Sequence, residues 1–254
     1  FQTIGNIIEL IEKDDIPKYL LFLENAFPYM DNYNYHKGMN GIIQELTGLL
    51  RTKNIGTDSD RALLLDFQAT LETKPEKAIK LEKDALAQIE TITADNARLV
   101  SNLHANLGGL YRMNGHPDLA REHMEKSISL LDQFNLLHIN DSIPQIANYA
   151  MFLTEQQEPE RGISELQKLS GIIKEYHSDD CLDYAKVQET LGTIYLMTAN
   201  LPQAKTHFKR AFKIYEKIWA DEPEMIEAKY QEIQELYPQI GFCIGKNLSG
   251  LLTK

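Results

Sequence analysis

Apolar side chains recur at every third or fourth position through most of the chain, with charged and amide side chains between them. The segment from Ala97 to Met113 shows this spacing at Leu99, Leu103, Leu107, Leu110 and Met113. Residues so spaced lie along one face of an α-helix, so we expect a helix over 97–113 that packs by one side.

A break in this pattern follows at Asn114-Gly115. Glycine there can adopt positive φ as a helix C-cap, and Pro117 has the fixed φ that suits the first turn of a helix. We therefore expect a second helix over 117–134. Pro75 and Pro159 occupy the corresponding positions elsewhere, and Pro202 comes one residue later, so the same pair of helices is expected four times.

The repetition has a period of 42 residues and is visible in four columns of positions. They read Leu65, Leu107, Tyr149 and Leu191; Ala78, Ala120, Gly162 and Ala204; Asp66, Gly108, Ala150 and Gly192; and Ala69, Tyr111, Leu153 and Tyr195. Small residues at a fixed position indicate where two helices touch closely. Repeats of about 20 to 50 residues are typical of solenoids, in which each unit buries its apolar face against its neighbours.

Two of these units resemble the tetratricopeptide repeat family. Their motifs are Asn106-Leu107-Gly108-Gly109-Leu110-Tyr111 with Gly115, Ala120 and Met124, and Thr190-Leu191-Gly192-Thr193-Ile194-Tyr195 with Ala204, Phe208 and Ala211. The other two depart from the family pattern at Asp66, Gly162 and Leu169. Family units have about 34 residues, so this longer period implies roughly two more helical turns and is similar to the repeats of kinesin light chains. The resemblance implies an all-α, right-handed superhelical solenoid of antiparallel helix pairs.

We expect three regions along the chain. Residues 1–56 form an N-terminal helical segment with helices near 4–11, 17–27 and 36–50, either a cap or one more degenerate repeat. Residues 57–224 hold four 42-residue helix pairs. Residues 225–254 form an unfinished repeat or a C-terminal capping helix. The apolar segment from Ile240 to Leu252 within it is expected to pack on the helix containing Phe212 and Tyr215 or to be buried in a dimer.

The charge and composition of the chain limit the classes of partner that it is expected to bind. With 37 acidic and 26 basic residues the net charge is −11, so direct binding of nucleic acid is not expected. Apolar runs are too short for a membrane span and no signal sequence opens the chain, which favours a cytoplasmic protein with reduced Cys181 and Cys243. A lysine stripe from Lys205 to Lys217 is interpreted as a solvated helix face, or else as a surface for an acidic partner.

No catalytic motif stands out, so we expect no enzyme, no cofactor and no metal. Phosphate loops, metalloprotease motifs and nucleophile elbows are absent from the sequence. The nearest histidine cluster is His104, His116 and His123, which we interpret as structural. Asp179-Asp180 is expected to cap the next helix.

The resemblance implies a concave surface lined by the first helix of each pair, where an asparagine holds the backbone of a bound extended peptide. The matching positions here are Asn106 and Asn148, with Thr190 in place of a third asparagine. An amide can donate to and accept from a peptide bond. The same face is expected to carry Lys186 and Glu155, and also Arg112 if it is broad. Alternatively, the asparagines tie adjacent first helices together.

The function we predict is a non-enzymatic module that binds a protein or peptide segment in the concave groove, as the sensor or scaffold part of a larger regulatory protein. Two alternatives stay open. One is a self-association element that forms a homo-oligomer, and the other is a regulator of a phosphotransfer protein.

Overall fold

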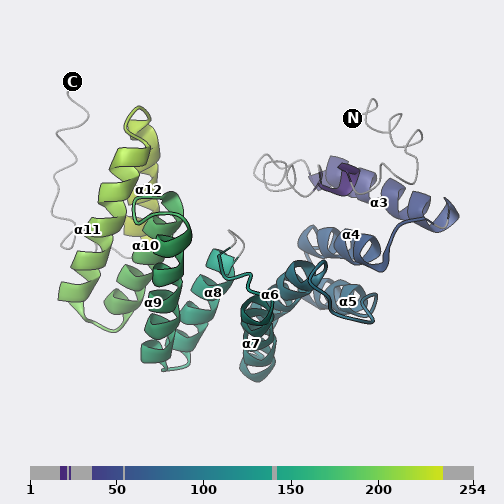
Figure 1. Cartoon of the computed structure of the whole chain (residues 1–254), viewed down its shortest axis with the longest axis horizontal. Coiled ribbons are helices and arrows are strands. Elements are labelled where there is room, and N and C mark those ends of the chain that lie inside the picture. Colours follow the sequence, from purple (N-terminus) through teal and green to yellow (C-terminus); the bar gives the residue numbers. More distant parts are fainter. Residues whose placement is uncertain (1–17, 22, 24–35, 54, 139–141, 237–254) are drawn as a thin grey trace. The chain divides into compact units, whose positions relative to one another are not determined.

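The computed structural model describes residues 18–21, 23, 36–53, 55–138 and 142–236. Every regular element among these residues is an α-helix, which confirms the all-α prediction. The chain divides into two compact units, residues 1–134 (unit 1) and 135–254 (unit 2), whose helices are labelled in Figure 1. The region boundaries expected at 56 and 224 stay predictions.

Unit 1 holds five long helices within its described residues. They are α3 (His36–Lys53), α4 (Asp58–Thr70), α5 (Pro75–Leu86), α6 (Ala97–Met113) and α7 (Pro117–Gln133). The helix α4 packs against α5 and α6 packs against α7, so each forms a pair, and α5 also contacts α6. The bounds expected for α6 and α7 are confirmed, with α7 ending one residue early.

Unit 2 has the same plan. Its described helices are α8 (Ser142–Glu155), α9 (Pro159–Tyr176), α10 (Leu182–Met197), α11 (Leu201–Ile218) and α12 (Pro223–Leu236). The pairs are α8 with α9 and α10 with α11, and the first helices α8 and α10 also contact each other. Each unit is therefore a stack of helix pairs of the solenoid type.

The expected column of small residues lies where the helices of each pair cross. Ala78, Ala120, Gly162 and Ala204 are all buried. A Cβ atom added to Gly162 would lie 2.6 Å from the backbone oxygen of Ala150, and one added to Gly192 would lie 3.0 Å from the ring of Phe208. The small residues that recur every 42 positions thus lie at close helix crossings, as the sequence predicts.

The turn inside three of the pairs is also built alike. Gly115, Gln157 and Ala199 have φ values of 72°, 65° and 58° and lie 42 residues apart. The next backbone N–H bonds back to the carbonyl five residues earlier, from His116 to Tyr111 in the first case and from Asn200 to Tyr195 in the third. This is a Schellman C-cap, in which the left-handed residue is usually glycine.

Replacing Ala199 with glycine should therefore stabilise unit 2. A left-handed conformation costs an L-residue about 1–2 kcal/mol, part of which glycine returns as greater freedom in the unfolded chain. We expect a gain of roughly 0.5–1 kcal/mol in the free energy of unfolding, measured by urea denaturation. An Ala185→Gly variant is the control, because Ala185 lies inside α10 and glycine there should lower stability.

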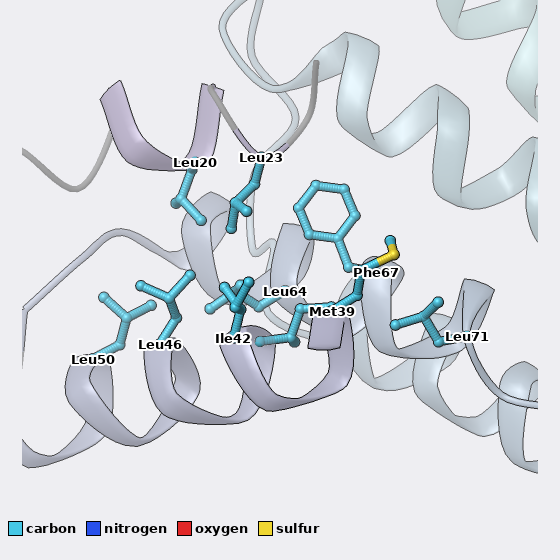
Figure 2. Packing of buried hydrophobic residues seen from close by; sticks show 10 residues of the cluster. Leu20, Leu23, Met39, Ile42, Leu46, Leu50, Leu64, Phe67 and Leu71 are labelled. Carbon is cyan, nitrogen blue, oxygen red and sulfur yellow. The ribbon is translucent and has the colours of Figure 1, made fainter. Parts of the chain in front are cut away.

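The N-terminal part of unit 1 is held by an apolar cluster shown in Figure 2. Leu20 and Leu23 point from one short helical stretch toward Ile42 and Leu46 of α3, while Leu64 and Phe67 of α4 join them. The expected helix near 36–50 is confirmed as α3. The expected helix near 4–11 and the segment 237–254 lie outside the described residues, as does Cys243.

The last described helix covers part of α11. Tyr230 of α12 meets the ring of Phe212 edge to face, with ring centroids 6.0 Å apart. The helix α12 therefore contacts the surface around Phe212. The segment from Ile240 to Leu252 that was expected to pack there lies outside the described residues.

Candidate functional site

The six residues expected to line a binding surface fall into two groups. Asn106 and Arg112 lie on α6 in unit 1, whereas Asn148 and Glu155 lie on α8 and Lys186 and Thr190 on α10 in unit 2. Because α8 and α10 contact each other, the last four belong to neighbouring first helices. We use the name first-helix face of unit 2 for these four residues of α8 and α10, of which Asn148, Glu155 and Lys186 are exposed and Thr190 is half-buried.

Asn148 on that face has a polar side chain that is open to solvent. Its side chain is exposed, and its amide has no hydrogen-bond partner among the described residues. Lys186 is also exposed and lies 3.8 Å from Asp183, one turn away on α10. Thr190 donates its hydroxyl to the carbonyl oxygen of Lys186 at 3.0 Å, and Glu155 is exposed at the end of α8. The face therefore presents an amide, a cation and an anion to solvent.

Asn106 is engaged differently. Its side-chain N–H donates to Asp66 Oδ1 at 2.8 Å, across from α6 to the preceding first helix α4. This is the tie between adjacent first helices that the sequence left as an alternative. Arg112, half-buried in the last turn of α6, also lies in unit 1.

Asp66 also faces a second acid that sequence reasoning missed. Glu82 of α5 is 1% exposed and occupies the position that Met124, Leu166 and Phe208 hold in the other pairs. Burial raises the pKa of Glu82 to about 10, and the charge of Asp66 and a hydrogen bond with it act in the same direction, while a hydrogen bond from Asn106 opposes them. Glu82 is therefore protonated near neutral pH. Its position 42 residues before Met124 was the signal available in the sequence.

Two histidines of the expected cluster, His104 and His123, contact each other. His104 of α6 and His123 of α7 share a hydrogen bond between their Nδ1 atoms, which lie 2.9 Å apart. Burial lowers the pKa of His104 to about 4, with contributions from His123 and Lys126. The ring whose Nδ1 accepts must be neutral, and burial lowers the pKa of both His104 and His123, which favours the neutral form of each. No group of three metal-ligating side chains occurs within the described residues.

The acid in the middle of α10 is already used by the fold. Glu189 accepts a hydrogen bond from the hydroxyl of Tyr215 at 2.5 Å. Its carboxylate also forms an ion pair with Lys229 Nζ at 3.0 Å. These contacts join α10 to α11 and α12. The carboxylate of Glu189 is thus engaged by contacts within unit 2.

The expectation that Asp179-Asp180 caps the next helix is wrong. The N-cap of α10 is Cys181, without a side-chain cap hydrogen bond, and Asp180 instead forms an ion pair with Lys217 of α11. The last lysine of the stripe, Lys217, lies close enough to Asp180 to form this ion pair. The other lysines of the stripe, Lys205, Lys209 and Lys213, are exposed, as expected for a solvated helix face.

None of the described helices is long and apolar enough to cross a membrane. This agrees with the apolar runs in the sequence.

The helix pairs, their close crossings and their repeated turns define a helical-repeat protein. The tetratricopeptide repeat family model matches residues 142–217, from α8 to α11, so the expected resemblance to this family is confirmed. No curated protein matches the sequence.

Solved structures support the same assignment of fold. A Podosopora anserina protein of nearly identical, kinesin-light-chain-type TPR-like repeats superposes with a TM-score of 0.63 at 13% identity, over 83% of this chain and 99% of that one. BtubC (BKLC) from P. vanneervenii gives a TM-score of 0.53 at 18% identity, over 80% of this chain and 74% of that one. At such identities the likeness shows the fold alone.

Proposed function

We propose that the chain is a non-enzymatic scaffold that binds an extended segment of a protein partner on the first-helix face of unit 2. The fold is one used for protein–protein interaction, and the sequence carries no catalytic motif. The observation that carries the proposal is the exposed amide of Asn148, which has no partner among the described residues. A peptide bond offers the donor and the acceptor that such an amide needs.

The neighbouring charges favour a mixed, polar segment. Lys186 and Glu155 lie on the same face with opposite charge, so a bound strand with one acidic and one basic side chain would complement both. The hydroxyl of Thr190 already donates its hydrogen to the carbonyl oxygen of Lys186. It can therefore only accept a hydrogen bond from a ligand. The larger regulatory assembly expected from the sequence remains part of this proposal.

A peptide selected from a random display library on the intact chain tests the site. Replacing Asn148 with alanine should weaken binding of the selected peptide roughly two- to ten-fold, the net value of one neutral hydrogen bond. Isothermal titration calorimetry measures the affinity, and circular dichroism checks that helicity is unchanged.

Gln167→Ala is the matched control, because Gln167 is an exposed amide on the second helix α9. It should leave the affinity unchanged. If both variants weakened peptide binding equally, or if neither weakened it, the peptide would bind at another site. Light scattering on the same samples measures self-association, the alternative that the sequence leaves open.

A further inference from the structure

A cavity of about 370 Å³ lies in unit 1 between the last turns of α3, the middle of α4 and the segment that follows α5. Its size falls within the roughly 300–1,000 Å³ of small-molecule sites. Leu50, Leu64 and Leu65 form an apolar wall, and Thr47 and Gln88 lie at its polar edge. None of the residues of the proposed peptide site lines it.

The wall belongs to the packed core. Leu50 and Leu64 are 4% and 2% exposed and are members of the apolar cluster in Figure 2, whereas Leu65 is half-buried. The core fixes the positions of Leu50 and Leu64, and only the small exposed part of each, together with Leu65, can face the cavity. The apolar surface is therefore preformed.

Two arginines supply the charge at this cavity, and the fold neutralises one of them. Arg61 donates to Asp58 Oδ1 at 2.5 Å and to the carbonyl oxygen of Gly56 at 3.3 Å. Gly56 has a φ of 83°, and a Cβ there would lie 2.9 Å from Leu50 Cδ2. The turn thus fixes Arg61 against the leucine wall with its charge compensated.

The other guanidinium belongs to Arg51. Arg51 is exposed, and no described residue forms a hydrogen bond or an ion pair with it. An otherwise acidic chain, of net charge −11, therefore places one uncompensated cation beside an apolar cavity. A planar guanidinium pairs bidentately with carboxylate or phosphate oxygens.

We propose that this cavity binds a small aliphatic carboxylate, with the carboxylate on Arg51 and the alkyl chain on Leu50, Leu64 and Leu65. The single uncompensated charge matches a monoanion better than the dianion of an alkyl phosphate. The apolar wall requires a hydrocarbon body rather than a bare ion. This site is independent of the peptide site on unit 2.

Isothermal titration calorimetry of the intact chain with butanoate, hexanoate and octanoate tests the proposal. Affinity should rise about four-fold for each methylene group that becomes buried. Octanol should bind at least about ten-fold more weakly than octanoate, because it lacks the charge-assisted hydrogen bonds. Octyl phosphate should bind no more tightly than octanoate.

Substitutions locate the site. Arg51→Gln should weaken octanoate roughly 10- to 100-fold, and Arg51→Lys should fall between this variant and the unmodified chain, since lysine keeps the charge and loses the bidentate geometry. Lys80→Gln is the matched control, because Lys80 is an exposed cation on α5 that does not line the cavity.

Three outcomes would overturn the proposal. The first is no saturation with any chain length at millimolar concentration. The second is an equal affinity for octanol, or a higher one for octyl phosphate. The third is an equal loss in the Arg51→Gln and Lys80→Gln variants, which would mean that octanoate responds only to the net charge.

Discussion

Replacing Gly162 with alanine is expected to lower the free energy of unfolding by roughly 1–2 kcal/mol. The added Cβ would lie 2.6 Å from the backbone oxygen of Ala150, and backbone atoms cannot move aside as a flexible side chain can. Overpacking costs about 1–3 kcal/mol, and a contact with backbone is expected in the upper part of this range, at about 2–3 kcal/mol. The better helix propensity of alanine returns about 1 kcal/mol of this cost. Urea denaturation followed by circular dichroism measures the loss.

The same helix offers a control of opposite sign. Gly171 also lies within α9, but a Cβ there would meet nothing within 4 Å. Gly171→Ala should therefore raise stability by about 1 kcal/mol through helix propensity alone. If both alanines stabilised the protein, the close crossing of α8 and α9 at Gly162 would be wrong.

Raising the pH from 6 to 9 is expected to destabilise unit 1 because of Glu82. The folded-state pKa of Glu82, about 10, is raised above its ordinary value of 4.5 by burial and by Asp66. Between these values the folded chain keeps a proton that the unfolded chain releases. Stability is therefore greatest below pH 4.5 as far as this group is concerned, and it falls as the pH rises, by at most about 1.4 kcal/mol per pH unit.

A Glu82→Gln variant should lose this part of the pH dependence, since an amide keeps the shape and cannot titrate. Urea denaturation at pH 6 and at pH 9 measures the difference for each protein. Glu76→Gln is the control, because Glu76 is exposed in the first turn of the same helix. The assignment fails if Glu82→Gln and the unmodified chain lose stability equally between the two pH values.

Much of the fold could be predicted because its signals are local. The end of α6 and the start of α7 follow from Gly115 and Pro117, which act within one turn of their own positions. The helix crossings follow from the repeat, since Gly162 and Ala204 mark the same contact in different pairs. Such features need no knowledge of distant side chains.

The contacts of the candidate sites could not be predicted in the same way. The bond from Asn106 to Asp66 joins residues 40 positions apart and depends on the side-chain rotamer of each. Asp180 contacts Lys217 rather than the helix that follows it, because the second helix of the next pair returns to that turn. The cavity beside Arg51 requires the placement of α3 on α4, which no repeat column describes.

The shared Schellman turn has a consequence for where the chain can vary in length. Inside three pairs the turn is a closed hydrogen-bonded ring, so an added residue would break it. The connections between pairs are not constrained alike: residues 87–96 join α5 to α6, whereas 177–181 join α9 to α10. The longer connection is largely exposed at Glu90, Thr91 and Thr93. Insertions, such as a reporter peptide, are therefore best tolerated near Glu90 in this connection, before the hydrogen bonds that join Asn96 to Thr91 and Thr93.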